Sequence, residues 1–514
     1  MDWIASALLV GHYGLLATLC IFGVHRLYIT YQARHYRPPP LPEQTFEELP
    51  CVTVQLPLYN EQYVAQRLID AVVQLDYPSH LLQIQVLDDS TDSTPELVAQ
   101  RVEQYRKEGL WIEHIRREDR SGYKAGALGE ALATAEGEFI AVFDADFLPK
   151  PDWLMNVIHY FHDPDVGLVQ AQWAYLNRHD SLLTRLQGIM LDAHFGIEQS
   201  ARYASGVFFN FNGTAGIWRR TAIDEAGGWQ ADTITEDLDL SYRAQLVGWE
   251  FVYLRNVQCL SELPADMNAF KNQQRRWSKG GAEVMMKLLS RSWRTKLPNR
   301  KDRKETQIRS SLRTLRIKLE ASLHLASNLT HLLILIDSAV FLIPAVVLRQ
   351  DILPYPPIWV DLVLFTFGGL SHIYFYLTAQ DVLDRGAWRH LWLVPLLMAT
   401  SIGLSRSNGS GVWEALRGHK SPFLRTPKKG EVGSTSPATP AIKPEQSGGY
   451  LSQFTLSGET IEVVLGISYL IAALWCVQQQ IYLALPFMVL FAIGFLYAGT
   501  WSMRERIALS LTAG

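Results

Sequence analysis

Cysteine is scarce in this chain, and the spacing of the few cysteines excludes two kinds of stabilising site. The 514 residues contain four of them, Cys20, Cys51, Cys259 and Cys476. No two form a Cys-x-x-Cys pair, so neither a zinc site nor a disulfide framework is predicted. We therefore expect the polar middle region of the chain to lie in the cytosol.

Two common nucleotide-binding signatures are also missing. The sequence has no Gly-x-Gly-x-x-Gly turn and no Walker glycine loop, which disfavours NAD and ATP as ligands. Lysine and arginine total 47 against 51 aspartate and glutamate residues, a formal net charge of −4. Without a basic excess, or a basic stripe interleaved with aromatic side chains, nucleic-acid binding is not expected.

Long apolar runs are present at both ends of the chain. The first extends from about Ile4 to Ile29, long enough to cross a hydrocarbon core about 30 Å thick. Arg26, Arg34 and Arg37 accompany its C-terminal end, and no basic residue precedes it. This pattern predicts an uncleaved membrane anchor with its N-terminus outside.

The other apolar runs follow the polar region, at about Leu319–Leu348, Ile358–Thr378, Leu391–Leu404, Ile461–Val477 and Ile481–Trp501. A strongly basic stretch precedes them and indicates the cytoplasmic face. The third run is short, and a full span there would place Arg417 and Lys420 outside, against the charge rule. We therefore predict one span before the polar region and four after it, with an interfacial or re-entrant segment at the third run.

These features divide the chain into six parts. In order they are an anchor (1–36), a globular cytosolic domain (37–290), a basic interfacial segment (291–318), two spans (319–378), an interfacial or re-entrant segment with a loop (379–460) and the C-terminal spans (461–514).

The globular region has the pattern of an α/β fold. Three short runs are rich in apolar residues, as expected of parallel strands covered on both faces: Val52–Leu58, Gln83–Leu87 and Phe139–Phe143. Ser93-Thr94-Pro95-Glu96 has the features of a helix start, namely a capping residue, a proline suited to the first turn and an early acid. In such sheets ligands bind beyond the carboxyl ends of the strands.

Acidic residues follow two of these strands. Asp144 and Asp146 form a D-x-D whose carboxylates suit a divalent cation that bridges a diphosphate. The alternative is an acidic turn that only ends a strand. Asp88 and Asp89 are suited to accept hydrogen bonds from a base or ribose, or to cap the loop before the next helix.

Two further segments carry candidate groups for chemistry. Lys124 lies near a predicted helix start, where phosphate binding is favoured, although a solvated lysine is the alternative. Glu236 and Asp237 precede an amphipathic run and therefore lie at a helix N-terminus. They can cap the helix dipole, or Asp237 can act as a general base towards an acceptor hydroxyl.

The segment Gln273-x-x-Arg276-Trp277 has a structural and a functional interpretation. It fits an amphipathic helix with a buried tryptophan. It also fits a sugar site, because Trp277 offers a flat apolar face for stacking and Arg276 can hold diphosphate oxygens through two hydrogen bonds.

Together these segments resemble the inverting family 2 glycosyltransferases of the processive, cellulose-synthase-like type, and most closely the mannan and glucomannan synthases and their bacterial relatives. The resemblance covers about Pro50 to Gly280. It is carried by Val86–Asp92, Gly122–Leu128, Phe143–Phe147, Phe211–Trp218, Gly227–Trp229, Glu236–Leu240 and Gln273–Trp277. It implies a GT-A-type domain, a mainly parallel sheet with helices on both faces, inserted between transmembrane helices.

The resemblance also implies roles for single residues. It places nucleotide-sugar contacts at Asp88, Asp89, Lys124, Asp144 and Arg276, and Mg²⁺ or Mn²⁺ at Asp144 and Asp146. It makes Asp237 the catalytic base. It places the acceptor sugar near Phe211, Asn212, Gly213, Glu236, Gln273 and Trp277. It suggests a gating loop that includes Phe423, Arg425, Thr426 and Lys428.

The implied activity is elongation of a polysaccharide, with β-1,4-mannan or glucomannan favoured, from GDP-mannose or UDP-glucose by an enzyme in the plasma (inner) membrane. The partners would be the nucleotide sugar, the growing glycan and the lipid bilayer, with no nucleic acid. Three alternatives stay open: a UDP-glucose-dependent β-glucan synthase, a transferase that acts on a lipid acceptor, and a non-catalytic membrane scaffold that has kept the fold.

Overall fold

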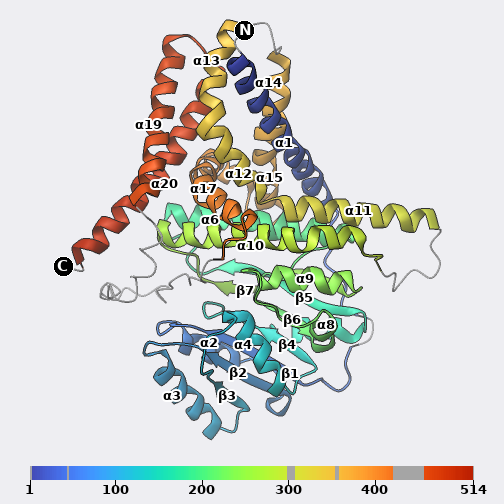
Figure 1. The fold of residues 1–514 in the computed structure, drawn as a ribbon. Helices are drawn as coiled ribbons and strands as arrows, with labels where there is room; N and C mark the ends of the chain where they lie inside the picture. Colours follow the sequence, from blue (N-terminus) through green and yellow to red (C-terminus); the bar gives the residue numbers. More distant parts are fainter. Residues whose placement is uncertain (1–2, 43–44, 298–306, 353–357, 421–455, 513–514) are drawn as a thin grey trace.

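The computed structural model of this chain describes residues 3–42, 45–297, 307–352, 358–420 and 456–512. Figure 1 shows long helices at the top, helix α10 (Met267–Arg294) across the middle and an α/β domain at the bottom. The chain enters this domain after helix α1 (Trp3–Ala33) and returns to the helical part through α10. The α/β domain is therefore inserted between helical segments, as the sequence predicts.

One seven-stranded sheet, in the order β3-β2-β1-β4-β6-β5-β7, organises the α/β domain. Its strands are β1 Val52–Leu58, β2 Leu82–Asp88, β3 Ile112–Ile115, β4 Phe139–Val142, β5 Val166–Tyr175, β6 Gly216–Arg219 and β7 Glu250–Ser261. β6 runs antiparallel to β4 and β5, and the other neighbouring strands are parallel. The prediction of a mainly parallel sheet is confirmed, and the three predicted strands agree to within one residue at each end.

Helices cover both faces of this sheet. Alternate side chains of a strand point to opposite faces, so Phe139 and Ala141 of β4 belong to one core and Ile140 and Val142 to the other. The first core includes α2 and α3, and the second includes α4, α8 and α9. The helices of the domain are α2 Ala65–Val73, α3 Thr94–Lys107, α4 Tyr123–Ala131, α5 Met155–Ile158, α6 Leu182–Ala193, α7 Ser200–Ser205, α8 Arg220–Glu225 and α9 Glu236–Leu246.

The start of α3 differs in one detail from the prediction. Ser93 does not cap the helix; its hydroxyl donates instead to Gln62 Oε1 at 2.6 Å. The carboxylate of Asp92 accepts from the backbone N–H of Thr94 at 2.9 Å and satisfies that donor. The prediction that the segment Ser93–Glu96 supplies the capping side chain is therefore wrong, because the Asp92 carboxylate, which precedes this segment, satisfies that donor.

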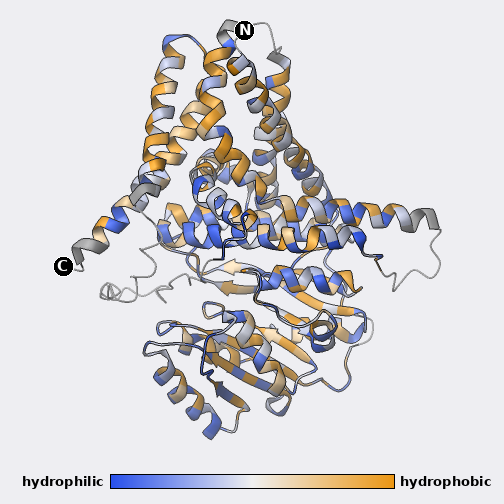
Figure 2. Cartoon of the chain, in the orientation of Figure 1, coloured by the Kyte–Doolittle hydropathy of each residue, from blue (hydrophilic) through white to orange (hydrophobic). Residues whose placement is uncertain are grey.

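Five helical segments are long and apolar enough to cross a membrane within the described ranges, the number predicted. They are Trp3–Ala33, Leu329–Arg349, Trp359–Val382, Gly458–Gln478 and Leu485–Ala508. Figure 2 shows that apolar residues dominate these upper helices, whereas polar residues dominate the outside of the α/β domain. The helices are α12 Leu329–Ile336, α13 Leu342–Ile352, α14 Ile358–Phe365, α15 Ser371–Val382, α16 Ala387–His390, α17 Leu393–Leu416, α19 Leu456–Gln478 and α20 Leu485–Thr512.

Two boundaries in this region depend on tertiary contacts. The run predicted from Leu319 is divided, because Leu319 belongs to a separate helix, α11 (Gln307–Ala326), and the span begins at Leu329. All but the first two residues of the short run at Leu391–Leu404 lie in α17, which is not among the five candidate spans. Most residues of α17 are buried against α10, α12 and α20.

The contact between α17 and α20 depends on glycine. A Cβ atom on Gly403 would lie 2.2 Å from the carbonyl oxygen of Gly494, and one on Gly494 would lie 2.2 Å from the carbonyl oxygen of Ala399. We expect Gly403→Val to force the two helices apart and to cost about 1–3 kcal/mol, as overpacking typically does. The temperature at which the detergent-solubilised chain loses its monodisperse chromatographic peak should fall.

Gly14→Val in α1 is the matched control, because a Cβ atom there meets nothing within 4 Å. An unchanged transition temperature for Gly403→Val would contradict the close packing of α17 on α20.

Candidate active site

A cavity of about 200 Å³ lies where the carboxyl ends of β1, β2 and β4 face the start of α9 and the N-terminal half of α10. Eleven of the thirteen predicted residues that the structure describes line this cavity: Asp89, Lys124, Asp144, Asp146, Asn212, Gly213, Glu236, Asp237, Gln273, Arg276 and Trp277. Two others, Asp88 and Phe211, do not line it. The predicted gating residues Phe423, Arg425, Thr426 and Lys428 lie outside the described residues.

The two acids after β2 have different environments. Asp88 is 1% exposed, and its carboxylate binds the Ser90 backbone N–H and the His114 ring at 2.9 Å each. Burial alone would raise its pKa, but these hydrogen bonds lower it. Asp89 lines the cavity and accepts two hydrogen bonds from Arg117, at 3.0 and 2.6 Å. Asp88 therefore supports the loop, and Asp89 is the one that reaches the cavity.

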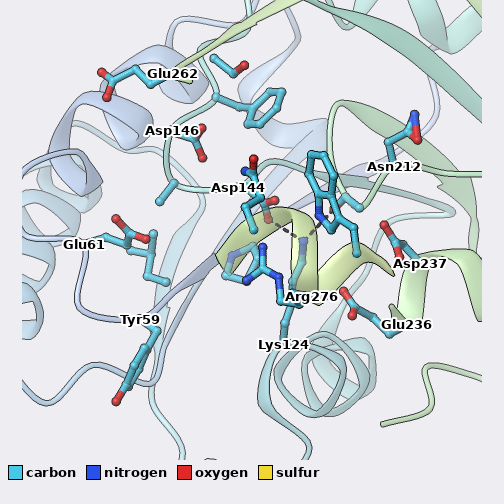
Figure 3. Close-up of a pocket in the computed structure, with 18 of the residues that line it drawn as sticks. Tyr59, Glu61, Lys124, Asp144, Asp146, Asn212, Glu236, Asp237, Glu262 and Arg276 are labelled. Carbon is cyan, nitrogen blue, oxygen red and sulfur yellow. Dashed lines mark hydrogen bonds and ion pairs between the residues drawn. The ribbon is translucent and has the colours of Figure 1, made fainter. Parts of the chain in front are cut away.

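Lys124 lies at the centre of the acidic groups (Figure 3). It is the second residue of α4. Its ammonium donates to Asp144 Oδ1 at 2.5 Å and to the Gly213 carbonyl at 2.8 Å. Burial alone would lower the pKa of Lys124, but the charges of Asp144 and Glu236 outweigh burial and raise it. Lys124 is therefore a stable cation beside the D-x-D.

Asp237 is a half-buried carboxylate at the N-terminus of α9. Its Oδ1 accepts from the Leu238 backbone N–H at 2.8 Å. Burial raises the pKa of Asp237 to about 7, repulsion from Glu236 adds to this shift, and the charge of Lys124 opposes it. A carboxylate with this pKa both accepts and releases a proton near neutral pH, as a general base requires.

Helix α10 supplies the wall of the cavity on the membrane side. Gln273, Arg276 and Trp277 are spaced three and four residues apart, so they share one face of the helix, and all three line the cavity. Trp277 also packs against a small buried core that consists of Tyr175, Leu191 and Leu263. The segment is therefore helical, as the structural interpretation predicts, and it also faces the cavity, as the functional interpretation requires.

The start of α10 is fixed to the membrane helices. Asp266 caps it by accepting from the Ala269 backbone N–H at 2.8 Å. Glu505 of α20 accepts from the N–H groups of Met267 and Asn268 at 2.8 and 3.0 Å. The first N–H groups of a helix have no partner within the helix, and these bonds satisfy them. The bonds to Glu505 also connect α10, which forms the cavity wall, to α20.

The segment before β6 positions three predicted residues differently. Phe211 is fully buried and packs its ring against Trp218, with ring centres 5.7 Å apart. Asn212 lines the cavity, and its Oδ1 accepts hydrogen bonds from His194, Gln199 and Asn210. Gly213 has φ +80°, and a Cβ atom on it would lie 3.0 Å from Asp237 Oδ2. Phe211 thus supports Asn212 and Gly213 from behind.

Sequence reasoning missed several lining residues, including Tyr59, Glu61, Arg120 and Glu262. The guanidinium of Arg120 lies 3.2 Å from the centre of the Tyr59 ring. Tyr59 and Glu61 directly follow β1, so the rule that ligands bind beyond carboxyl ends of strands was a usable signal for them. Glu262 directly follows β7, a strand that was not predicted, and Arg120 comes from the loop before α4, so only the fold shows that these two residues reach the cavity.

The D-x-D fits a divalent cation in its donor chemistry. Asp144 and Asp146 both line the cavity with hard carboxylate oxygens, and the cavity leaves room for further oxygen ligands. Within the part of the chain that the structure describes, no group of three or more His, Cys, Asp or Glu side chains is arranged to hold a metal alone. Such a cation would therefore need ligands from a bound phosphate or from water.

A mixed α/β sheet with helices on both faces and acidic residues at the carboxyl ends of its strands is the arrangement of a GT-A-type fold. Residues 50–280 match the family described as "Glycosyltransferase like family 2". This match agrees with the resemblance to the family 2 glycosyltransferases.

Two curated relatives are similar to this chain over the same region. Glucomannan 4-beta-mannosyltransferase 1 of Oryza sativa subsp. japonica is 46% identical over 272 residues, 51% of this chain and 52% of the relative. Glucomannan 4-beta-mannosyltransferase 2 of Arabidopsis thaliana is 46% identical over 252 residues, 48% of this chain and 47% of the relative. The matches span about half the length of these curated relatives.

One solved structure supports the fold. A mannosyltransferase from Pyrobaculum calidifontis, determined in complex with GDP-Man and Mn²⁺, aligns with a TM-score of 0.50 and 22% sequence identity. The alignment covers 76% of this chain and 98% of that one.

Proposed function

We propose that this chain is a membrane-embedded, inverting glycosyltransferase that extends a β-1,4-linked mannan or glucomannan with mannosyl groups from GDP-mannose. The observation that carries the proposal is a single cavity in which the half-buried Asp237 lies close to the ion pair of Lys124 and Asp144. The 46% identity to glucomannan 4-beta-mannosyltransferases supports mannose as the transferred sugar. The structural neighbour solved with GDP-Man supports a guanine nucleotide.

The proposed reaction is a direct displacement. Asp237 takes the proton from a hydroxyl at the non-reducing end of the glycan, and that oxygen bonds to the anomeric carbon of the donor. The bond between this carbon and the diphosphate oxygen breaks, and GDP leaves with the electron pair. Attack from the face opposite the leaving group converts an α-linked donor into a β-linked product, without a covalent enzyme intermediate.

The cationic side chains stabilise the departing diphosphate. Lys124 and Arg276 both line the cavity, and charge that develops on the leaving group is best stabilised by groups already held in place. Asp144 and Asp146 would hold Mg²⁺ or Mn²⁺ together with oxygens of the diphosphate. Such a cation, when bound, neutralises further charge on the leaving group.

The membrane part of the chain supports elongation next to the bilayer. Trp277 lies on α10, which packs against α17 and α20. We propose that the growing glycan stacks on Trp277 and leaves towards these helices, and that the catalytic domain faces the cytosol from the plasma (inner) membrane. Gln273, Asn212 and Glu236 line the same cavity and would bind hydroxyls of the acceptor sugar.

The pH dependence of the reaction follows from Asp237. Because the base must be deprotonated and its pKa is raised to about 7, the turnover number should rise with pH up to about 7 and then level off. Below that value the rate should fall about tenfold for each pH unit. Initial rates with saturating donor and acceptor between pH 5 and 9 measure this rise of the turnover number with pH. A rate that stays constant down to pH 5 would contradict the assignment of Asp237 as the base.

Gly213 provides a test of the geometry around the base. We expect Gly213→Ala to lower transfer by roughly ten- to a hundredfold, since the added methyl would press on Asp237 and displace it from its working position. Gly109→Ala is the matched control, because Gly109 has a similar φ of +87° but open space around it. We expect Gly109→Ala to keep its transfer activity, and equal activity of the two variants would contradict the crowding of Asp237 by a side chain at position 213.

The experiment that tests the proposed function is a donor comparison. The full chain, purified and reconstituted in lipid, is incubated with radiolabelled GDP-mannose, UDP-glucose or both, and the product is digested with linkage-specific mannanase or glucanase. We expect a polymer from GDP-mannose that mannanase degrades. A glucanase-sensitive product from UDP-glucose would change the donor, and a single-sugar lipid product would replace elongation by lipid glycosylation.

A further inference from the structure

Helix α11 leaves a row of leucines uncovered. Leu312, Leu315 and Leu319 are 62%, 46% and 49% exposed. They are spaced three and four residues apart, so they lie along one side of the helix. Single exposed leucines are ordinary, but a continuous apolar row indicates a surface that another apolar phase covers.

The opposite side of α11 is already occupied. Ala321 and Leu325 are each 1% exposed and belong to the same core as Met285 and Leu288 of α10. The helix is therefore held in a fixed orientation by its buried side, and the leucine row points away from the domain. No rearrangement is needed to present the row.

Basic side chains border the leucine row. Arg313 and Arg316 are exposed, and Arg316 lies one helical turn after Leu312. Lys318 donates to the carbonyl of Trp293 at 2.6 Å and so lies towards α10. An apolar row flanked by arginines is the arrangement of a helix that rests in the plane of a membrane surface.

The position of α11 favours a membrane, rather than a protein partner, as the phase that covers the leucine row. The candidate span Leu329–Arg349 begins three residues after α11 ends at Ala326. Figure 1 shows α11 extending sideways from the base of the membrane helices, at the level of α10, and Figure 2 shows its mixture of apolar and polar residues. A bilayer that surrounds the span must end near this level, so its surface lies where the leucine row is presented.

We propose that α11 is a binding surface for anionic phospholipid, with the leucine row among the acyl chains and Arg313 and Arg316 on the headgroups. The leaflet concerned is the one next to the α/β domain. Basic residues near an anionic surface each favour binding, and the effect is lost with their charge. This inference does not depend on which sugar the chain transfers.

The test places a reporter on the leucine row. In the full chain carrying Cys20→Ser and Cys51→Ser, a fluorophore is attached at Leu312→Cys; the remaining cysteines, Cys259 and Cys476, are fully buried. The protein is reconstituted in phosphatidylcholine nanodiscs that contain brominated phosphatidylglycerol or, at the same mole fraction, brominated phosphatidylcholine. We expect both lipids to quench the fluorophore and the anionic lipid to quench it more strongly.

Neutralising the arginines should remove this preference. For Arg313→Gln with Arg316→Gln, we expect the apparent affinity for brominated phosphatidylglycerol to fall by roughly fivefold for each charge removed. Lys107→Gln with Lys150→Gln removes the same charge from exposed sites on the α/β domain and should leave the preference intact. If the arginine variant does not fold, a fluorophore at Leu319→Cys still tests the contact in the chain that carries Cys20→Ser and Cys51→Ser and keeps both arginines.

Either of two results would overturn the proposal. Absence of quenching by both lipids at Leu312→Cys and Leu319→Cys would show that the row does not enter the bilayer. Equal quenching by the two lipids with both arginines in place would show that the surface does not distinguish anionic headgroups.

Discussion

A chain in which Asp237 is replaced by asparagine is expected to bind the nucleotide sugar and transfer almost none of it. Asparagine keeps the shape of the side chain and the hydrogen bond from the Leu238 N–H, but it cannot accept the proton of the acceptor hydroxyl. Loss of a positioned general base typically costs about 10²–10⁴ in rate. The turnover number should fall by this factor, while the Kd for GDP-mannose, measured by calorimetry, should change little.

Glu236→Gln is the informative comparison for this variant. Glu236 is the neighbouring buried acid, and its charge contributes to the raised pKa of Asp237. Its replacement should therefore move the rise of the pH–rate profile to lower pH and leave measurable transfer. An Asp237→Asn chain that still elongates, or an inactive Glu236→Gln chain with an active Asp237→Asn chain, would remove Asp237 from the role of base.

The second large effect is expected at Lys124. Replacement by methionine keeps the length of the side chain but removes the cation that pairs with Asp144 and faces the departing diphosphate. Removal of one such stabilising group costs about 10²–10³ in turnover number. Because Lys124 also lowers the pKa of Asp237, the pH–rate profile should move to higher pH in the same variant.

Initial rates between pH 5 and 10 measure both consequences of Lys124→Met. Lys150→Met removes the same charge from an exposed position four residues after Asp146 and should keep both the rate and the profile. If Lys124→Met lowers the rate but does not shift the pH–rate profile, Lys124 acts in donor binding and does not influence the pKa of Asp237.

Local pattern was sufficient for the short strands that are mostly apolar. Val52–Leu58, for example, is covered on both faces and pairs with parallel neighbours, so burial accounts for its valines and leucines. β6 is different. It is four residues long and reversed in direction, and its pairing with β4 and β5 arises from contacts distant in sequence. No local pattern carries that information.

The candidate site was predictable where one segment supplies several groups. Gln273, Arg276 and Trp277 share a helix face, so their spacing already places them together. The separate positions of Asp88 and Asp89 were not predictable, because only the fold shows that His114 and Ser90 bury the first carboxylate. The same applies to Arg120, whose position against Tyr59 depends on the meeting of two loops.

The divided helix after α10 shows the limit of hydropathy. Leu319 continues an apolar run into the next span, but Ala321 and Leu325 bury themselves against α10 and make α11 a separate helix. Hydropathy records how apolar a residue is and does not distinguish a lipid contact from a protein contact. The start of the span at Leu329 follows from packing.

The configuration and linkage of the product test the central claim most directly. The purified, reconstituted chain is supplied with GDP-mannose and a β-1,4-mannotetraose acceptor, and the lengthened oligosaccharide is examined by NMR. An inverting transferase with Asp237 as base predicts that each new mannosyl group is β-linked to O4 of the former terminal sugar. An α-linked addition, or equal elongation by the Asp237→Asn chain, would contradict the account.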